Sequence, residues 1–319
     1  MSFSGMVKEE LSKKLGASQH CRVAELAAFY SACGKIRHLP DGTRELRLQT
    51  ENETVARKCF TILKKTFNIE TDIAVHENSH LKRCKVYSIT IKETERVREI
   101  LKAVKLSAKA GGEGALGVCH AAVVQKECCR RAFIRGAFLA SGSISDPKKG
   151  YHFEIVCAEE EKARQLQGMI RSFQIDAKIV LRKKSYVVYV KEGAQIVDML
   201  AVMEANVALM DLENIRILKE MRNSVNRKVN CETANINKTV SAAVKQVEDI
   251  KLIESMAGFE SLSEGLEEIA RLRLQYPEAT LKELGMMLNP QVGKSGVNHR
   301  LRKLGMIADA LRKSKEELL

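Results

Sequence analysis

Residues 24–36 read AELAAFYSACGKI, and residues 132–144 read AFIRGAFLASGSI. The two stretches align at a constant offset that places Gly34 on Gly142. Each stretch is apolar, carries small residues at positions that share one helix face, and ends at a glycine. We therefore expect two equivalent helices that approach each other closely and that each end at the glycine.

This paired pattern resembles the two-helix seam of the LAGLIDADG homing endonucleases. In that family, each seam helix presents a metal-binding carboxylate just before its final glycine. The corresponding positions here hold Cys33 and Ser141. A thiol or a hydroxyl does not ligate a hard divalent cation as a carboxylate does. The resemblance therefore implies a nuclease fold without catalytic residues.

The segments around the two helices recur in the same order. The first copy is predicted to have helices over 22–33, 52–67 and 93–106 and strands over 45–49, 69–75 and 85–91. The second copy is predicted to have helices over 127–140, 159–173 and 193–203 and strands over 152–157, 175–181 and 186–190. The strand segments are rich in β-branched and aromatic residues. We predict an α+β fold in which a duplicated LAGLIDADG-like domain of αββαββα type, with antiparallel sheets, spans a first half 1–110 and a second half 111–205.

The chain is basic and shows no export or membrane signal. Its 319 residues exceed what one hydrophobic core usually serves, and the formal net charge of +13 favours a polyanionic partner such as nucleic acid. The first residues lack the apolar run of a signal peptide, and no window approaches a membrane span. We expect a cytoplasmic, nucleoid-associated protein with no membrane partner.

Nine cysteines without a regular framework are expected to be reduced thiols. The chain contains no CxxC pair, which argues against a structural zinc site. His76, His80 and Cys84 are spaced by four, but they fall in a predicted loop between strands, where that spacing does not converge. We expect no metal site and no cofactor.

Residues 206–255 are predicted to form a helical linker. Helical periodicity appears twice in this segment and is interrupted by an Asn-rich joint, so we predict two helices. Possible DNA contacts here are Arg222, Asn226, Arg227 and Lys228. Asparagine and cationic residues suit phosphate contacts, but they suit a solvated linker equally.

Residues 256–319 are predicted to form an all-α helix-turn-helix domain. Capping-box patterns at 261–264 and 280–283 open two helices, and the pairs Tyr276-Pro277 and Asn289-Pro290 end them. A glycine-containing turn then leads to a third helix that starts near Lys294 or Ser295. This is the spacing of a helix-turn-helix motif.

The third helix of this segment has two distinct faces. Val297, Leu301 and Leu304 lie within about 60° of one another on a helix, so we expect them to pack inward. Arg pairs with guanine and Asn with adenine, and flanking cations suit phosphates. The predicted DNA-binding residues are Thr280, Lys282, Lys294, Ser295, Asn298, His299, Arg300, Arg302 and Lys303.

The sheets of the duplicated domain offer further cations. Arg44 and Arg47 in the first half, and Lys178, Arg182, Lys183 and Lys184 in the second, are candidates for DNA contact. They can equally be solvated strand edges, where lysine discourages aggregation.

Three stretches together resemble the WhiA family of bacterial transcription regulators. They are the degenerate seams, the run NRKVNCETAN over 226–235, and the run SGVNHRLRKL over 295–304. The resemblance covers nearly the whole chain. It implies an N-terminal domain derived from a homing endonuclease, a linker and a DNA-binding helix-turn-helix. It further implies a role in cell division, chromosome segregation and sporulation, without nuclease activity.

Three functions compete on the sequence. The first is a sequence-specific regulator that binds double-stranded DNA at promoters. The second is an adaptor that recruits another transcription regulator or RNA polymerase. The third is an active nuclease with acids from elsewhere, such as Asp146 or Glu154.

Overall fold

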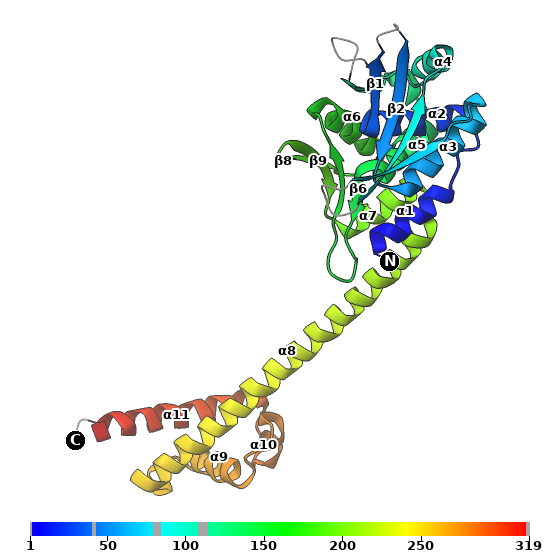
Figure 1. Cartoon of the computed structure of the whole chain (residues 1–319). Coiled ribbons are helices and arrows are strands. Elements are labelled where there is room, and N and C mark those ends of the chain that lie inside the picture. Colours follow the sequence, from blue (N-terminus) through cyan, green and yellow to red (C-terminus); the bar gives the residue numbers. More distant parts are fainter. Residues whose placement is uncertain (1, 40–42, 79–83, 108–113, 317–319) are drawn as a thin grey trace. The chain divides into compact units, whose positions relative to one another are not determined.

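The structure is a computed structural model that describes residues 2–39, 43–78, 84–107 and 114–316. The chain divides into two compact units, residues 1–219 and 220–319 (Figure 1). The first unit combines helices with two sheets, and the second is helical throughout its described part. This agrees with the predicted α+β class with an all-α C-terminal part.

The first unit consists of one leading helix and two copies of an αββαββα sequence. The leading helix is α1 (Phe3–Lys13). The first copy is α2 (Gln19–Cys33), β1 (Gly34–His38), β2 (Arg44–Thr50), α3 (Glu53–Phe67), β3 (Ile73–Asn78), β4 (Cys84–Ile91) and α4 (Thr94–Val104). The second copy is α5 (Glu127–Ser141), β6 (Gly142–Ile144), β7 (Phe153–Cys157), α6 (Glu160–Arg171), β8 (Lys178–Arg182), β9 (Ser185–Val190) and α7 (Gly193–Met203). The predicted duplication is confirmed.

The two sheets have equivalent strand orders. The first is ordered β3-β4-β2-β1-β5 and the second β6-β7-β9-β8, so β1-β2-β4-β3 matches β6-β7-β9-β8. All pairings within them are antiparallel. The first sheet gains the short edge strand β5 (Gly114–Ala115), which pairs with β1.

Several predicted boundaries were wrong. The strands predicted to start at 69 and 175 begin at Ile73 and Lys178. The chain turns at the left-handed residues Asn68 and Gln174, and the buried Ile69 and Ile175 that follow belong to no strand. The strands β1 and β6 were not predicted. Each begins at the glycine that ends a seam helix, and each is recognisable only through its pairing with the next strand.

The helices α2 and α5 form the centre of the first unit. Their residues 24–31 and 132–139 are buried almost without interruption. At Gly136 an added Cβ would lie 2.8 Å from the Glu25 carbonyl oxygen and 2.9 Å from the Ala28 Cβ. The small residues predicted for this face therefore allow the close approach of the two helices.

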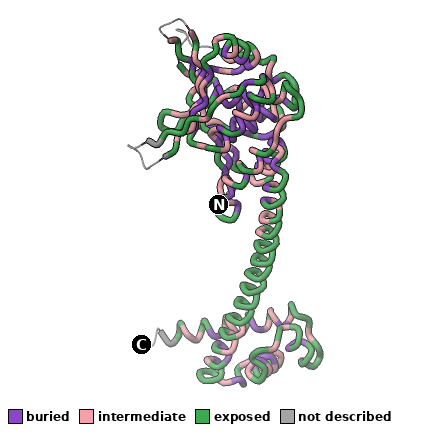
Figure 2. Tube along the Cα trace, turned by 45° about the vertical axis from the view of Figure 1, so that its right-hand side comes forward, coloured by how far each residue is buried: buried purple, intermediate pink, exposed green. Residues whose placement is uncertain are grey.

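A single helix, α8 (Asn206–Met256), replaces the two predicted linker helices. The carboxylate of Glu10 on α1 accepts hydrogen bonds from the Val207 and Ala208 amides, at 2.9 and 3.0 Å, and so caps the start of α8. Residues 220–242 are exposed on nearly every side (Figure 2). The asparagines of this segment lower helix propensity only slightly, and neither glycine nor proline interrupts it.

The second unit has its own hydrophobic core. It contains the end of α8, a 3₁₀ turn at Phe259–Ser261, α9 (Glu264–Gln275), α10 (Leu281–Met287) and α11 (Lys294–Glu316). Ile250 and Ile253 of α8 are buried in this core. The buried carboxylate of Asp249 lies 2.5 Å from the Arg312 guanidinium. The last turns of α8 thus contribute to the C-terminal core, although they fall within the segment predicted to be a linker.

None of the helices in the described part of the chain combines the length and the apolar character that a bilayer crossing requires.

Candidate nucleic-acid interface

The turn between α10 and α11 is fixed by a close backbone contact. The Val292 amide donates a 3.0 Å hydrogen bond to the Gly285 carbonyl. A Cβ added at Gly285 would lie 2.0 Å from the Val292 carbonyl oxygen. Only glycine therefore permits the chain to fold back so tightly, and this contact sets where α11 begins.

One of the two predicted capping boxes is present. Thr280 and Glu283 bond each other's backbone amides at the start of α10. These bonds lower the pKa of the Glu283 carboxyl. The capping box predicted at 261–264 was wrong. Phe259–Ser261 forms a 3₁₀ turn, and α9 starts only after Ser263, whose side chain makes no capping hydrogen bond.

Arg273 holds the turn between α9 and α10. Its guanidinium donates to the carbonyls of Pro277 and Ala279 at 3.2 and 2.7 Å. The side chain is buried, and burial lowers its pKa. This role of Arg273 was not predicted, because a single arginine is not part of any recognisable sequence motif.

The helix α11 starts at Lys294, as predicted. The side chains of Val297, Leu301 and Leu304 are buried, which confirms the predicted inner face. The opposite face is open to solvent. Its exposed residues are Lys294, Ser295, His299, Arg302 and Lys303, and Asn298 is half-buried beside them. Lys282 on α10 and Thr280, the N-cap residue before it, are also exposed, although the Thr280 hydroxyl already accepts the cap bond from the Glu283 amide.

Arg300 differs from the other predicted contacts, because its guanidinium is bound within the domain. It donates a 3.2 Å hydrogen bond to the Gly265 carbonyl on α9 and lies 4.0 Å from Glu268. A Cβ at position 265 would lie 3.3 Å from this guanidinium, so the glycine leaves the space that Arg300 occupies. In this arrangement Arg300 joins α11 to α9.

The four linker candidates are exposed, but they do not form one face. On a helix with about 100° per residue, Arg222 and Asn226 share one side. Arg227 and Lys228 point away from that side, and they lie about 100° from each other. Arg227 also donates a 3.3 Å hydrogen bond to the Asn223 carbonyl. A partner on one side of α8 would therefore contact only some of them.

In β1 and β2 of the first sheet, cationic residues alternate with buried residues, so they lie on the face opposite the core. Lys35 pairs with Arg47 across β1 and β2, and Arg37 lies two residues further along β1. The Arg47 Nε donates a 2.8 Å hydrogen bond to Ser88. Arg44, at the start of β2, is exposed. Lys35 and Arg37 were missed because β1 was not predicted.

The second sheet is less basic on its corresponding face. Arg182 is paired with Glu154 at 3.2 Å, and Lys178 lies 3.6 Å from Asp176. Exposed Val180 lies between Lys178 and Arg182 on β8, and exposed Val156 lies two residues from Glu154 on β7. Lys183 and Lys184 form the exposed turn that follows Arg182.

Cys33 and Ser141, which occupy the positions of the metal-binding carboxylates in homing endonucleases, are the last residues of α2 and α5. Burial raises the pKa of the Cys33 thiol to about 11, although Lys8 and Lys162 counteract it. The Ser141 hydroxyl donates to the Ala137 carbonyl of its own helix at 3.4 Å. A thiol that stays protonated and a hydroxyl already bonded to the backbone mean that neither Cys33 nor Ser141 supplies an anionic oxygen.

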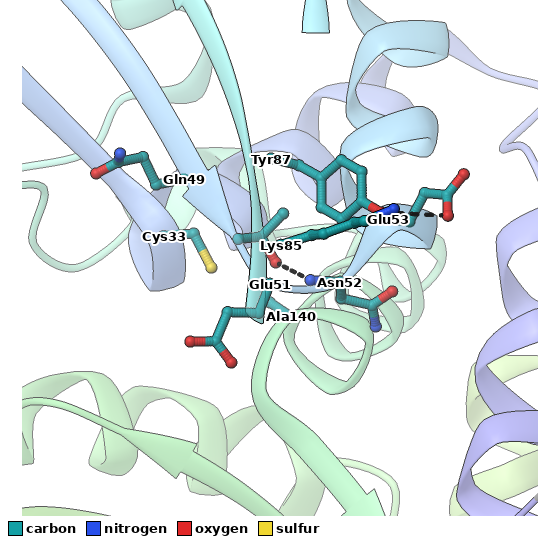
Figure 3. A pocket seen from close by; sticks show the side chains of 9 residues that line it. Cys33, Gln49, Glu51, Asn52, Glu53, Lys85, Tyr87 and Ala140 are labelled. Carbon is teal, nitrogen blue, oxygen red and sulfur yellow. Dashed lines mark hydrogen bonds between the residues drawn. The ribbon is translucent and has the colours of Figure 1, made fainter. Parts of the chain in front are cut away.

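Cys33 faces a hollow lined by Gln49, Glu51, Glu53 and Tyr87 among others (Figure 3). The carboxylate of Glu53 is engaged by Arg57 at 2.5 Å and by the Tyr87 hydroxyl at 3.3 Å. Within the described residues, no three potential metal ligands converge in this hollow.

Asp146 and Glu154, the alternative catalytic acids considered from the sequence, also accept hydrogen bonds from neighbouring residues. The Asp146 carboxylate accepts the Lys148 amide in a turn. Glu154 accepts bonds from Ser143, His152 and Arg182 at 3.1, 3.0 and 3.2 Å. Burial alone would raise the pKa of Glu154, but the bonds from His152 and Ser143 and the charge of Arg182 outweigh it and lower this pKa.

Three family models match successive parts of the chain. The WhiA N-terminal LAGLIDADG-like domain matches residues 19–107, the WhiA LAGLIDADG-like domain matches 130–222, and the WhiA C-terminal HTH domain matches 225–308. The last match contains α9, α10 and the start of α11.

Full-length relatives agree with these models. The chain is 59% identical over 313 residues to the "Probable cell division protein WhiA" of Lachnoclostridium phytofermentans, covering 98% of this chain and 100% of the relative. It is 46% identical to the protein of the same name from Clostridium botulinum, covering 98% and 99%. The crystal structure of full-length DUF199/WhiA from Thermatoga maritima is similar with a TM-score of 0.60 and 25% identity, covering 97% of this chain and 99% of that one.

Proposed function

The chain belongs to the WhiA family, and from this premise we propose that it is a sequence-specific regulator of transcription that binds double-stranded promoter DNA through α11. The name of the two relatives, cell division protein, supports a role in cell division. We extend the proposal to chromosome segregation and sporulation on the family resemblance alone.

The exposed face of α11 is the observation that carries this proposal. A recognition helix reads the major groove with the residues of its first turns. Asn298 and Arg302 stand four residues apart on the outer side of α11, and both residue types can bond a base edge bidentately. Lys294, Lys303 and Lys282 flank them and suit phosphates.

The duplicated domain is proposed to be catalytically silent. Hydrolysis of DNA with a divalent metal requires carboxylates that converge where both seam helices end. Cys33 and Ser141 supply none, and Asp146 and Glu154 are engaged by their neighbours. Magnesium-dependent cleavage of a random DNA library by the pure protein would refute this part.

Selection of bound fragments from a genomic library tests the binding proposal. The wild type is expected to enrich a defined motif, which footprinting then delimits. Changing Asn298 and Arg302 to Ala should weaken binding by about 1–3 kcal/mol for each base that is no longer bonded, and should broaden the motif. Met306→Ala is a matched control, since Met306 is exposed further along the same helix. Full selectivity in the double variant would show that α11 does not read the sequence.

The same experiment separates the adaptor alternative. An adaptor would enrich promoter fragments only when a second regulator or RNA polymerase is present. We propose direct binding, so enrichment by the pure chain is the expected result.

A further inference from the structure

The other end of the α2–α5 seam gathers three thiols and an imidazole. His20 and Cys21 lie in the first turn of α2, and Cys128 and Cys129 lie in the first turn of α5. Their four potential ligand atoms all lie within 4.8 Å of one another. Cys21 stands about 18 Å along α2 from Cys33, so this cluster is separate from the vacated acid positions.

From this convergence we propose that His20, Cys21, Cys128 and Cys129 bind one tetrahedral, thiophilic divalent cation, with Zn²⁺ as the best fit.

The distances suit four ligands on a single ion. The His20 Nδ1 lies 3.2 Å from the Cys129 Sγ, 3.3 Å from the Cys21 Sγ and 4.0 Å from the Cys128 Sγ. Zinc binds sulfur at about 2.3 Å and imidazole nitrogen at about 2.0 Å, so tetrahedral ligands stand roughly 3.5 Å (N to S) and 3.8 Å (S to S) apart. The observed nitrogen-to-sulfur distances fall around the expected value, and the sulfur atoms lie within 4.8 Å of one another.

The ligand types select the cation. Three thiolates and one neutral imidazole form a Cys₃His set, which is one of the usual sets of structural zinc sites and suits Mg²⁺ or Ca²⁺ poorly. Both pairs lie at helix N-termini, where the backbone amides favour thiolates. The four ligand atoms lie within 4.8 Å of one another, so three thiolates here would repel one another unless a cation lay between them.

The duplication explains how such a site can arise. Cys128 follows His20 by 108 residues, the same offset that aligns the seam helices, and Cys129 therefore aligns with Cys21. Each half supplies two adjacent ligands from equivalent positions. Buried Ala24 and Ala132 bring the two helices together at this end. An ion here would clamp the two halves at the start of both seam helices.

The test is made on the full chain, purified under reducing conditions from zinc-supplemented cells. Elemental analysis should find about one zinc per chain. The variant Cys21→Ser/Cys129→Ser should contain almost none. Cys231→Ser is the matched control, since Cys231 is an exposed thiol on α8, and it should keep its zinc. Equal metal content in all three proteins would overturn the proposal.

Two further readouts keep the proposal falsifiable if the double variant folds poorly. Wild type stripped by a chelator should bind cobalt(II) with the intense visible absorption of a tetrahedral thiolate site and should release protons as it does so. Cys128→Ser, which changes an exposed ligand, should weaken binding more than about tenfold in competition with a coloured chelator. The absence of a tetrahedral cobalt spectrum, or a Cys21–Cys129 disulfide in the protein isolated under reductant, would refute the site.

Discussion

The guanidinium of Arg135 on α5 donates two hydrogen bonds, each 3.3 Å long, to the carboxylate of Glu25 on α2. Both side chains are buried. Lys58 of α3 lies 2.5 Å from the same carboxylate, and Glu204, at the end of α7, lies 3.0 Å from Arg135. Two cations and two carboxylates thus balance across the seam, and they join both halves of the duplicated domain.

Replacing Arg135 by Met should destabilise the protein strongly. The buried carboxylate of Glu25 would keep only Lys58 as its partner, and removing one member of a buried ion pair costs about 3–5 kcal/mol. Urea unfolding followed by circular dichroism measures the change in the free energy of unfolding.

The control for this prediction is Arg164→Met. Arg164 forms an ion pair with Glu160 on one helix surface, and its side chain is 72% exposed. The expected loss is below about 1 kcal/mol. If Arg135→Met were no more harmful than this control, the buried cluster would not stabilise the seam.

Cys33 should make the stability depend on pH above neutrality. Burial raises the pKa of this thiol from its ordinary value of 9.0 to about 11. The folded state therefore keeps a proton that the unfolded chain loses. The protonated thiol contributes fully to the free energy of unfolding below pH 9. This contribution is lost as the pH rises towards 11, and the free energy of unfolding then falls by up to about 1.4 kcal/mol per pH unit.

This pH dependence is measured from urea unfolding between about pH 8 and pH 11, the range that brackets both thiol pKa values. Cys33→Ala should reduce the alkaline loss of stability, whereas Cys231→Ala, which changes an exposed thiol, should leave it unchanged. The slopes of unfolding free energy against pH are compared, and not the free energies themselves, because replacing Cys33 by alanine also alters packing. Identical slopes in wild type and Cys33→Ala would contradict a buried, protonated thiol.

The duplication could be predicted because one regular pattern encodes it twice. The seam helices have small residues at matching positions, and the αββαββα order follows from periodicity around them. The strand β1 escaped prediction because GKIRH contains a single inward apolar residue, Ile36, among glycine and cations. Its strand character comes from pairing with β2, which is a long-range effect.

Long-range contacts also explain the errors at the candidate sites. A helical wheel places Arg300 on the flank of α11, but it cannot show that Gly265 on α9 leaves room for the guanidinium. Likewise, a zinc site was not expected because the chain has no CxxC spacing. The ligands proposed here come as two adjacent pairs from two helices, and only the alignment of the repeats indicates that Cys21 and Cys129 meet.

Gly285→Ala should disrupt the helix-turn-helix. The new Cβ would lie 2.0 Å from the Val292 carbonyl oxygen, so the turn before α11 must shift. We expect weaker DNA binding and a loss of about 1–3 kcal/mol in the stability of the C-terminal unit. Thermal unfolding and a filter-binding assay on the same preparations measure both.

Gly293→Ala is the matched control for that turn. A Cβ at Gly293 meets nothing within 4 Å, and its φ is not in the left-handed region. Binding and stability should stay within about 0.5 kcal/mol of wild type. Equal effects of both alanines would mean that the close approach of Gly285 to Val292 does not position α11.

Lys282 and Lys303 should contribute to affinity without reading the sequence. Each is exposed beside the outer face of α11, where a lysine suits a phosphate. Changing either to Ala should weaken binding to all sequences alike. It should also reduce the slope of log K against log salt by about 0.9 for each phosphate that is no longer neutralised. Lys313→Ala, on the far part of α11, should leave the slope unchanged. A change in motif preference in Lys282→Ala or Lys303→Ala, with an unaltered slope, would instead assign that lysine to a base.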